Sequence, residues 1–131
     1  MLHPIDNRST RKALASITLL LLCLIFFGNV AHANCKEFNN YSIKNGVYIP
    51  GDDSERQVIG KGRLQFYSAP DKKCKIAGVF ILPGERVDAY TEYNNFTSVV
   101  YINVNTDANV TGWVQSDRLK PTGLGIAPHQ Q

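Results

Sequence analysis

Apolar residues are most concentrated near the start of the chain. Residues 13–30 are dominated by Leu, Ile, Phe and Ala, follow a basic segment, and end at the small-residue pattern Ala31-His32-Ala33. These three features in this order are typical of a secretory signal peptide. We therefore predict a signal peptide over residues 1–33, cleaved between Ala33 and Asn34. A transmembrane anchor is the alternative, but the run lies at the lower edge of the ~17–25 residues that a spanning helix needs.

The segment 34–60 is rich in polar and turn-forming residues. Within it, Tyr41–Ile43 and Gly46–Ile49 are predicted to be short strands, and Pro50–Asp53 is predicted to be a turn. Nothing after the signal has the periodicity of an amphipathic helix, so no α-helix is expected there. We interpret the segment as an N-terminal extension. The sequence leaves open whether it adds a strand, clamps the domain or contacts a partner.

From Gly62 onward, apolar and polar residues alternate, as in strands with one buried face. The predicted strands are Leu64–Tyr67, Gly78–Leu82, Arg86–Tyr93, Thr97–Val104 and Val110–Val114. The predicted turns between them are Ala69–Asp71, Pro83–Gly84, Asn94–Asn95 and Asn105–Asn109. Ser116–Leu119 is predicted to be a single helical turn, and residues 122–131 a flexible tail. Short strands with regularly spaced turns predict an all-β fold, a small sandwich or barrel.

Removal of the signal changes both the charge and the cysteine content. The net charge of +3 falls to about +1, because three basic residues and one acidic residue leave with the signal. Nothing therefore indicates a nucleic-acid-binding surface. Cys23 also leaves, and Cys35 and Cys74 are expected to form a disulfide in an oxidising compartment, which would stabilise the fold by roughly 3–5 kcal/mol. The alternative is a free reactive thiol, although neither cysteine has a histidine nearby to activate it.

The positions of the histidines exclude most catalytic chemistry. His3 and His32 lie in the predicted signal and His129 lies in the tail. A Ser-His-Asp triad and a zinc site both lack residues that they need in the remaining domain. We therefore expect no catalytic residues, no metal and no cofactor.

Carboxylates are the remaining candidates for catalysis. Asp52 and Asp53, with Glu55 nearby, lie in or beside a predicted turn, where aspartate is common for structural reasons. Asp88 and Glu92 share the outer face of one predicted strand. We interpret both groups as structural, and a carboxylate-dependent enzyme is the least favoured hypothesis for function.

Four segments with a recognisable order and spacing lie within about residues 60–120: Gly62–Pro70, Pro83–Val87, Asn95–Val99 and Gly112–Leu119. Together they resemble bacterial SH3-like domains. The first is similar to the opening strand and first loop of that family, and the second to the turn into its next strand. The third lies where the family has Gly-Trp-Tyr-x-Val, and the fourth is similar to its closing Gly-Trp-Val with a short helical turn.

The resemblance implies a small SH3-like β-barrel over residues 61–121, preceded by the extension that the disulfide would fasten. The chain differs from the family in having Phe96 where a Trp is usual, in its Cys74 insertion, and in the extension itself. The family's ligand preference therefore does not transfer directly.

Aromatic residues provide the candidate ligand site. Alternation places Tyr67 and Tyr90 on the face opposite the buried residues, Tyr93 and Phe96 flank a predicted turn, and Trp113 precedes an inward-facing Val. Rings along a groove are how SH3-like domains bind extended peptides. We take these five as candidate ligand-binding residues. The competing interpretation is a set of ordinary surface tyrosines and one core Trp.

The sequence thus favours a non-enzymatic binding module, periplasmic or secreted. The resemblance implies a peptidoglycan stem peptide or an envelope protein as its ligand. A second hypothesis is an inhibitor or immunity protein that blocks a cell-wall-degrading toxin or lysozyme, because a small exported domain without catalytic groups is complete in that role. No nucleic-acid partner and no stable membrane anchor after cleavage are expected.

Overall fold

The computed structural model describes residues 30–126 of the chain. The predicted signal peptide therefore lies outside the described residues, apart from residues 30–33. The chain divides into two units, Met1–Asn34 and Cys35–Gln131, and the second contains all of the described strands. Within residues 30–126, no helix is both long enough and apolar enough to cross a membrane.

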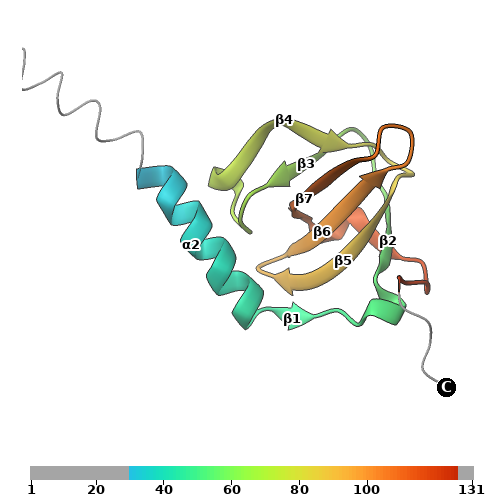
Figure 1. The fold of residues 1–131 in the computed structure, drawn as a ribbon, viewed down its shortest axis with the longest axis horizontal. Coiled ribbons are helices and arrows are strands. Elements are labelled where there is room, and N and C mark those ends of the chain that lie inside the picture. Colours follow the sequence, from blue (N-terminus) through green and yellow to red (C-terminus); the bar gives the residue numbers. More distant parts are fainter. Residues whose placement is uncertain (1–29, 127–131) are drawn as a thin grey trace, which may run out of the picture. The chain divides into compact units, whose positions relative to one another are not determined.

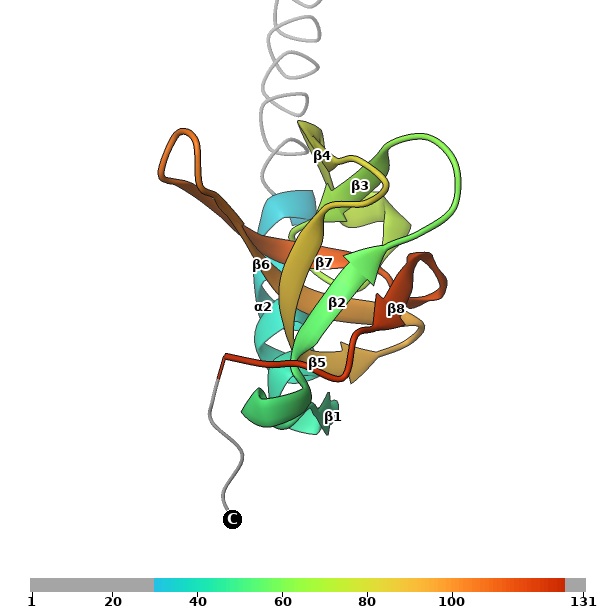
Figure 2. The ribbon, with the colours of Figure 1, turned by 90° about the vertical axis from the view of Figure 1, so that its right-hand side faces the viewer.

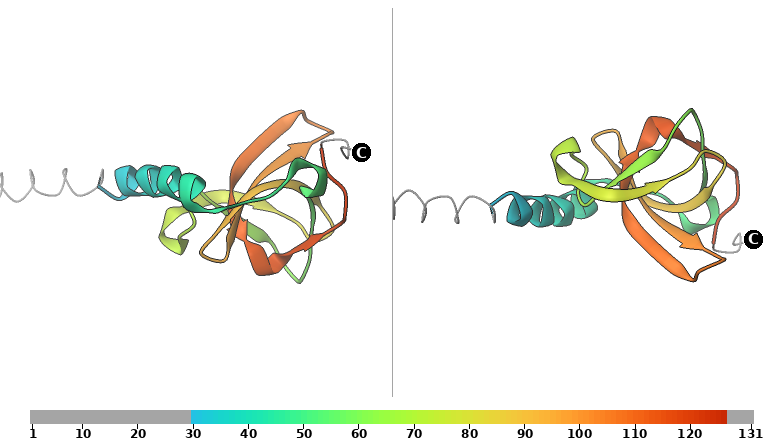
Figure 3. Two further views of the ribbon diagram at one scale, coloured as in Figure 1. Left: turned by 90° about the horizontal axis from the view of Figure 1, so that it is seen from below. Right: turned by 90° about the horizontal axis from the view of Figure 1, so that it is seen from above.

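The second unit consists mostly of antiparallel β-structure (Figure 1). Its strands are β1 Val47–Tyr48, β2 Glu55–Val58, β3 Leu64–Tyr67, β4 Lys75–Ile81, β5 Arg86–Tyr93, β6 Phe96–Asn103, β7 Ala108–Gln115 and β8 Leu119–Pro121. They form one sheet in the order β4-β3-β7-β6-β5-β2-β8, and β1 pairs with β5 beside this path. The sheet curls into a half-barrel, which Figures 2 and 3 show from other sides. The predicted all-β class is confirmed.

Helical segments accompany the strands. α2 Val30–Asn45 precedes β1, and the single-turn helices are η1 Gly51–Asp53, η2 Lys72–Cys74 and η3 Ser116–Arg118. The predicted turn before β2 is confirmed by η1, and the predicted helical turn after β7 is confirmed by η3.

The central strands follow the predicted alternation. β5 has the predicted bounds, and Val87 and Ala89 are buried between more exposed neighbours. Asn94 and Asn95 join β5 to β6 with φ of 48° and 62°. These are the left-handed values that a two-residue hairpin turn requires, and asparagine adopts them more readily than most residues.

The inner face of the half-barrel holds the hydrophobic core. Its buried side chains are Ile49, Val58, Leu64, Phe66, Ile81, Val87, Ala89, Val99 and Val114. Two of them, Ile49 and Val58, come from the predicted N-terminal extension. That extension also supplies β2, which is absent from the predicted strands and pairs with β5 and β8. Part of the extension is therefore an integral strand of the sheet.

The strand predicted at Tyr41–Ile43 is wrong, because these residues belong to α2. The expectation of no α-helix after the signal is wrong for the same reason. Buried and half-buried residues lie on one helical face at the spacing i, i+3, i+4, i+7, namely Cys35, Phe38, Asn39 and Ser42. Only two of these four are apolar. Tertiary contacts, rather than its asparagine-rich composition, therefore stabilise this helix.

The predicted disulfide is present. Cys35 of α2 and Cys74 of η2 are joined, with their Cα atoms 5.8 Å apart. The bridge fastens the helix to the segment between β3 and β4. A link of this kind stabilises a fold chiefly by restricting the unfolded chain.

The first part of the predicted flexible tail is bound to the sheet. The carbonyl of Leu124 accepts a hydrogen bond from the N–H of Glu55 at 2.9 Å, and the N–H of Ile126 donates to Oγ of Ser54 at 3.3 Å. The hydroxyl of Thr122 donates to Oε1 of Glu55 at 2.8 Å. Residues 122–126 are therefore held against β2, and residues 127–131 lie outside the described range.

Candidate functional site

Three buried aromatic side chains, Tyr67, Phe96 and Trp113, form a second cluster with Tyr93 packed against it. Tyr67 and Trp113 are register partners on β3 and β7. The rings of Tyr67 and Phe96 meet edge to face, with centroids 5.2 Å apart. Val114, next to Trp113, belongs to the inner core, so this cluster lies on the opposite, outer face of the sheet. We call it the outer aromatic cluster.

α2 covers the outer aromatic cluster. The indole N–H of Trp113 donates a hydrogen bond of 2.7 Å to Oδ1 of Asn39. This bond satisfies the polar atom of a side chain that is only 1% exposed, as a buried indole N–H requires. The rings of Phe38 and Tyr41 meet the Tyr93 ring edge to face, with centroids 6.0 and 6.1 Å away. The helix is therefore a second layer over this face.

These contacts change the interpretation of the predicted ligand site. Tyr67, Phe96 and Trp113 are 9%, 7% and 1% exposed, whereas Tyr90 is 38% exposed. Tyr93 is half-buried. Tyr67 does face away from the inner core, as alternation predicts, but the helix layer buries it. The five rings do not form an exposed groove, and that expectation is corrected.

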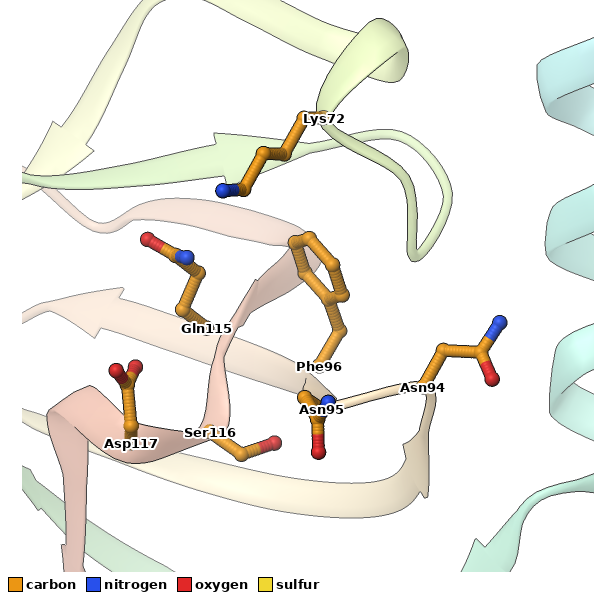
Figure 4. Close-up of a pocket in the computed structure, with 7 residues that line it drawn as sticks. All are labelled: Lys72, Asn94, Asn95, Phe96, Gln115, Ser116 and Asp117. Atoms are coloured by element: carbon orange, nitrogen blue, oxygen red, sulfur yellow. The ribbon is translucent and has the colours of Figure 1, made fainter.

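An open pocket of about 410 Å³ adjoins the outer aromatic cluster (Figure 4). We call it the outer pocket. Phe96 belongs to both features. The lining residues come from η2, the β5–β6 turn, the start of β6, the end of β7, and η3: Lys72, Asn94, Asn95, Phe96, Gln115, Ser116 and Asp117.

Paired strand ends hold one side of the outer pocket in place. Phe96 and Gln115 are register partners on β6 and β7. The N–H of Ser116 donates to the carbonyl of Asn95 at 2.9 Å, and the hydroxyls of Ser116 and Thr97 lie 2.8 Å apart. The β5–β6 turn and η3 are thereby fixed against each other.

The other side of the outer pocket is η2, which carries Lys72 (Figure 4). Asp71 caps this short helix by accepting a hydrogen bond from the N–H of Lys73 at 2.8 Å. Cys74 ends it and is bonded to Cys35 of α2. The disulfide therefore helps to position the cation at the pocket.

Most polar side chains around the outer pocket have no partner among residues 30–126. The side chains of Lys72, Asn94, Asn95, Gln115 and Asp117 make no hydrogen bond or ion pair to another described residue. By contrast, every buried side-chain nitrogen or oxygen in the described part of the chain has a partner. Free donors and acceptors beside an apolar ring are the composition of a site for a small molecule or a peptide.

The carboxylates considered for catalysis lie elsewhere. Asp88 of β5 is the register partner of Glu55 on β2, and Glu92 lies opposite β1 instead. Burial raises the pKa of Asp88, the negative charge of Glu55 raises it further, and a hydrogen bond with Ser54 lowers it. Glu55 is itself ion-paired with Arg86 at 3.0 Å. Glu55 also accepts the hydrogen bond from Thr122, so these carboxylates join β2, β5 and residues 122–126.

The remaining aspartates of interest belong to η1. Asp52 and Asp53 lie in its only turn, and Oδ1 of Asp53 is 3.9 Å from Nη1 of Arg56. Over residues 30–126, no group of three or more His, Cys, Asp or Glu side chains could hold a metal ion.

The chain matches no protein-family model, no curated protein and no solved structure. The resemblance to bacterial SH3-like domains therefore stays a prediction.

Of the residues that line the outer pocket, only Phe96 is among the predicted ligand-binding residues. Two polar segments, Asn94–Asn95 and Gln115–Asp117, supply most of the others. The sequence does indicate these two segments, because β6 and β7 are consecutive strands of a predicted hairpin. The residues before β6 and after β7 must therefore lie side by side. Lys72 has no such signal, since its position depends on η2 and on the disulfide.

Proposed function

We propose that this chain is an exported, non-enzymatic binding module and that the outer pocket is its ligand site. The observation that carries the proposal is the set of unpaired polar side chains around the Phe96 ring. They are presented by paired strand ends and short hydrogen-bonded turns, so little backbone conformational entropy is lost when a ligand binds. We also propose that the half-barrel is of the SH3-like type, which the order of the four sequence motifs supports.

Two features support a periplasmic or secreted location. The first is the basic, apolar and small-residue pattern of residues 1–33. The second is the Cys35–Cys74 disulfide, since such bonds persist in oxidising compartments and are rare in the cytosol.

The proposed ligand is a peptidoglycan stem peptide or a peptide segment of an envelope protein. The resemblance to bacterial SH3-like domains supports a peptide. The side-chain amides of Asn94, Asn95 and Gln115 add to this support, because each offers both donors and an acceptor to a peptide bond.

An inhibitor or immunity protein is the second candidate function. Apolar side chains exposed at the end of α2 and on β1 favour it, since Tyr41, Val47 and Tyr48 are 54%, 70% and 72% exposed. Exposed aromatic and apolar side chains are typical of surfaces that contact another protein. The partner would then be a cell-wall-degrading toxin or lysozyme.

Retention on purified sacculi tests the first proposal. The full chain is expressed in a bacterium, the exported protein is purified, and its sedimentation with sacculi is measured. Wild type is expected to sediment, Gln115→Ala is expected to lose most of this retention, and the matched control Gln57→Ala on β2 is expected to keep it. Tyr90→Ala tests the exposed ring that the sequence singled out. No retention of wild type on sacculi would contradict the proposal.

Protection against a lytic enzyme tests the second candidate. Cells that express a cell-wall-degrading enzyme encoded beside this gene are scored for survival with and without the chain. Rescue that is lost on Tyr48→Asp but kept on Gln115→Ala would establish the inhibitor function and replace the first proposal.

A further inference from the structure

Two opposite charges border the outer pocket. Lys72 comes from η2 and Asp117 from η3, so the two residues are distant in sequence. In Figure 4 the amide of Gln115 lies between the ammonium group of Lys72 and the carboxylate of Asp117. The lining of the pocket therefore presents a cation, an amide and an anion in that order in this view.

Neither charge is neutralised within the described part of the chain. Lys72 and Asp117 form no ion pair with each other, nor with another described residue. Charged pairs that do form, such as Arg86 with Glu55 at 3.0 Å, lie on another part of the sheet. The two free charges are thus available to a ligand at once.

The rest of the lining suits the middle of a short peptide. Gln115 can donate to and accept from a peptide bond, and the Phe96 ring offers an apolar surface for small side chains. A volume of about 410 Å³ lies within the range of ligand pockets, roughly 300–1,000 Å³. A neutral sugar would use the amides and the ring, and its hydroxyls would hydrogen-bond to Lys72 and Asp117, but it would bring no opposite charge to either residue.

We infer that the outer pocket recognises a short peptide that carries a free carboxylate and a free ammonium group. The carboxylate is bound by Lys72 and the ammonium group by Asp117, with Gln115 on the peptide bond between them. This inference rests on the proposed function and narrows its ligand to a zwitterionic peptide, as distinct from a glycan or an internal segment of a protein.

Capped peptides test the inference directly. The exported protein is titrated with Ala-Ala-Ala, its N-acetyl form, its C-amide form and the doubly capped form, and binding is followed by NMR of the side-chain amides and by calorimetry. The free peptide is expected to shift the Gln115 and Asn95 amide signals. Each cap is expected to weaken binding roughly tenfold, as the loss of one hydrogen bond to a charged group does.

Variants assign each end of the peptide to one residue. Lys72→Ala is expected to bind the free and C-amide peptides equally, and Asp117→Asn is expected to bind the free and N-acetyl peptides equally. Lys73→Ala and Asp107→Asn are the matched controls, since both residues are exposed and neither lines the pocket. Both controls are expected to keep the wild-type preference for free ends.

Several outcomes would overturn the inference. One is equal binding of all four peptides by wild type, and another is the absence of any shift with the free peptide. A third is a shift of the Gln115 amide by an N-acetylglucosamine oligomer alone, which would make the pocket a glycan site. If sacculi still retain wild type while Lys72→Ala and Asp117→Asn leave retention unchanged, the inference fails and the proposed function stands. If sacculi do not retain the wild-type protein, the proposed function itself is contradicted.

Discussion

The indole N–H of Trp113 is hydrogen-bonded to Oδ1 of Asn39, a residue 74 positions earlier in the chain. The bond joins β7 to α2 at the place where the helix buries the outer aromatic cluster. It is a contact between two residue types that hydropathy alone would never pair. The consequences of this helix layer can be measured.

Loss of the Asn39 acceptor should destabilise the protein. In Asn39→Ala the buried indole N–H of Trp113 is left without a partner, which should lower the free energy of unfolding by about 1–3 kcal/mol. Urea denaturation measures this, with the exposed neighbour Asn40 as the site of the control substitution Asn40→Ala. Asn39→Asp retains an acceptor oxygen and should recover most of the loss. If Asn39→Ala is as stable as wild type, the hydrogen bond from Trp113 to Asn39 does not contribute to stability.

Removal of the disulfide should cost more than any single hydrogen bond. Cys35 and Cys74 are separated by 39 positions, for which the chain-entropy model gives about 4 kcal/mol. The double variant Cys35→Ser with Cys74→Ser should therefore unfold at a much lower urea concentration. Dithiothreitol should lower the wild-type midpoint to a similar value and leave that of the double variant unchanged. A wild-type midpoint that does not respond to reduction would show that the bridge contributes nothing.

Asp88 should make stability decrease as the pH rises. Burial and the neighbouring Glu55 raise its pKa in the folded state above the ordinary aspartate value of about 3.9. The folded state therefore holds this proton more tightly than the unfolded chain. The contribution of Asp88 to stability falls as the pH rises from about 4 through its raised pKa.

Asp88→Asn imitates the protonated carboxyl and should remove this dependence. The difference in unfolding free energy between Asp88→Asn and wild type should grow in favour of the variant from about pH 4 to pH 7. Urea denaturation at several pH values measures it, and Asp107→Asn in the exposed β6–β7 loop is the control. If the difference in unfolding free energy between Asp88→Asn and wild type stays constant with pH, the pKa of Asp88 is not raised in the folded protein.

Gly46 should tolerate no side chain. A Cβ at this position would lie 2.7 Å from the carbonyl oxygen of Glu92 and 2.8 Å from that of Ser42. Gly46→Ala should therefore lower the unfolding free energy by about 1–3 kcal/mol, as overpacking does. Lys44→Ala, at an exposed position of the same helix end, is the control in thermal denaturation. Equal melting temperatures for the two variants would contradict the close approach of α2 to β5.

Hydropathy alone is sufficient to predict the hairpins at the centre of the sheet. β5 has one apolar face, and Asn94–Asn95 favours a tight turn, so local sequence and final structure agree there. The sequence does not predict β2, because one of the two buried residues of this strand is Arg56. This residue is only 7% exposed, and its guanidinium donates to the carbonyl oxygens of Asp53 and Glu55. A buried arginine conceals the alternation of the strand.

The candidate site was predictable only in part. The sequence indicates Phe96 as an aromatic residue beside a turn, but its burial depends on the outer aromatic cluster, which α2 covers. From residue 34 to its end, that helix has only Cys35 and Phe38 as apolar residues on its covered face, so hydropathy does not indicate this part of it. The two opposite charges at the pocket, Lys72 and Asp117, come from two short helical turns that are far apart in sequence. Their meeting requires the complete tertiary structure.

The long sequence separation between α2 and β7 also sets an order on folding. Asn39 and Trp113 are 74 positions apart, and the surface that the helix covers is complete only when β7 has joined the sheet. Contacts of such long sequence separation form slowly, because the intervening chain must first be ordered. Docking of α2 is therefore expected late in folding, and the fluorescence of Trp113, the single tryptophan of the chain, reports that step.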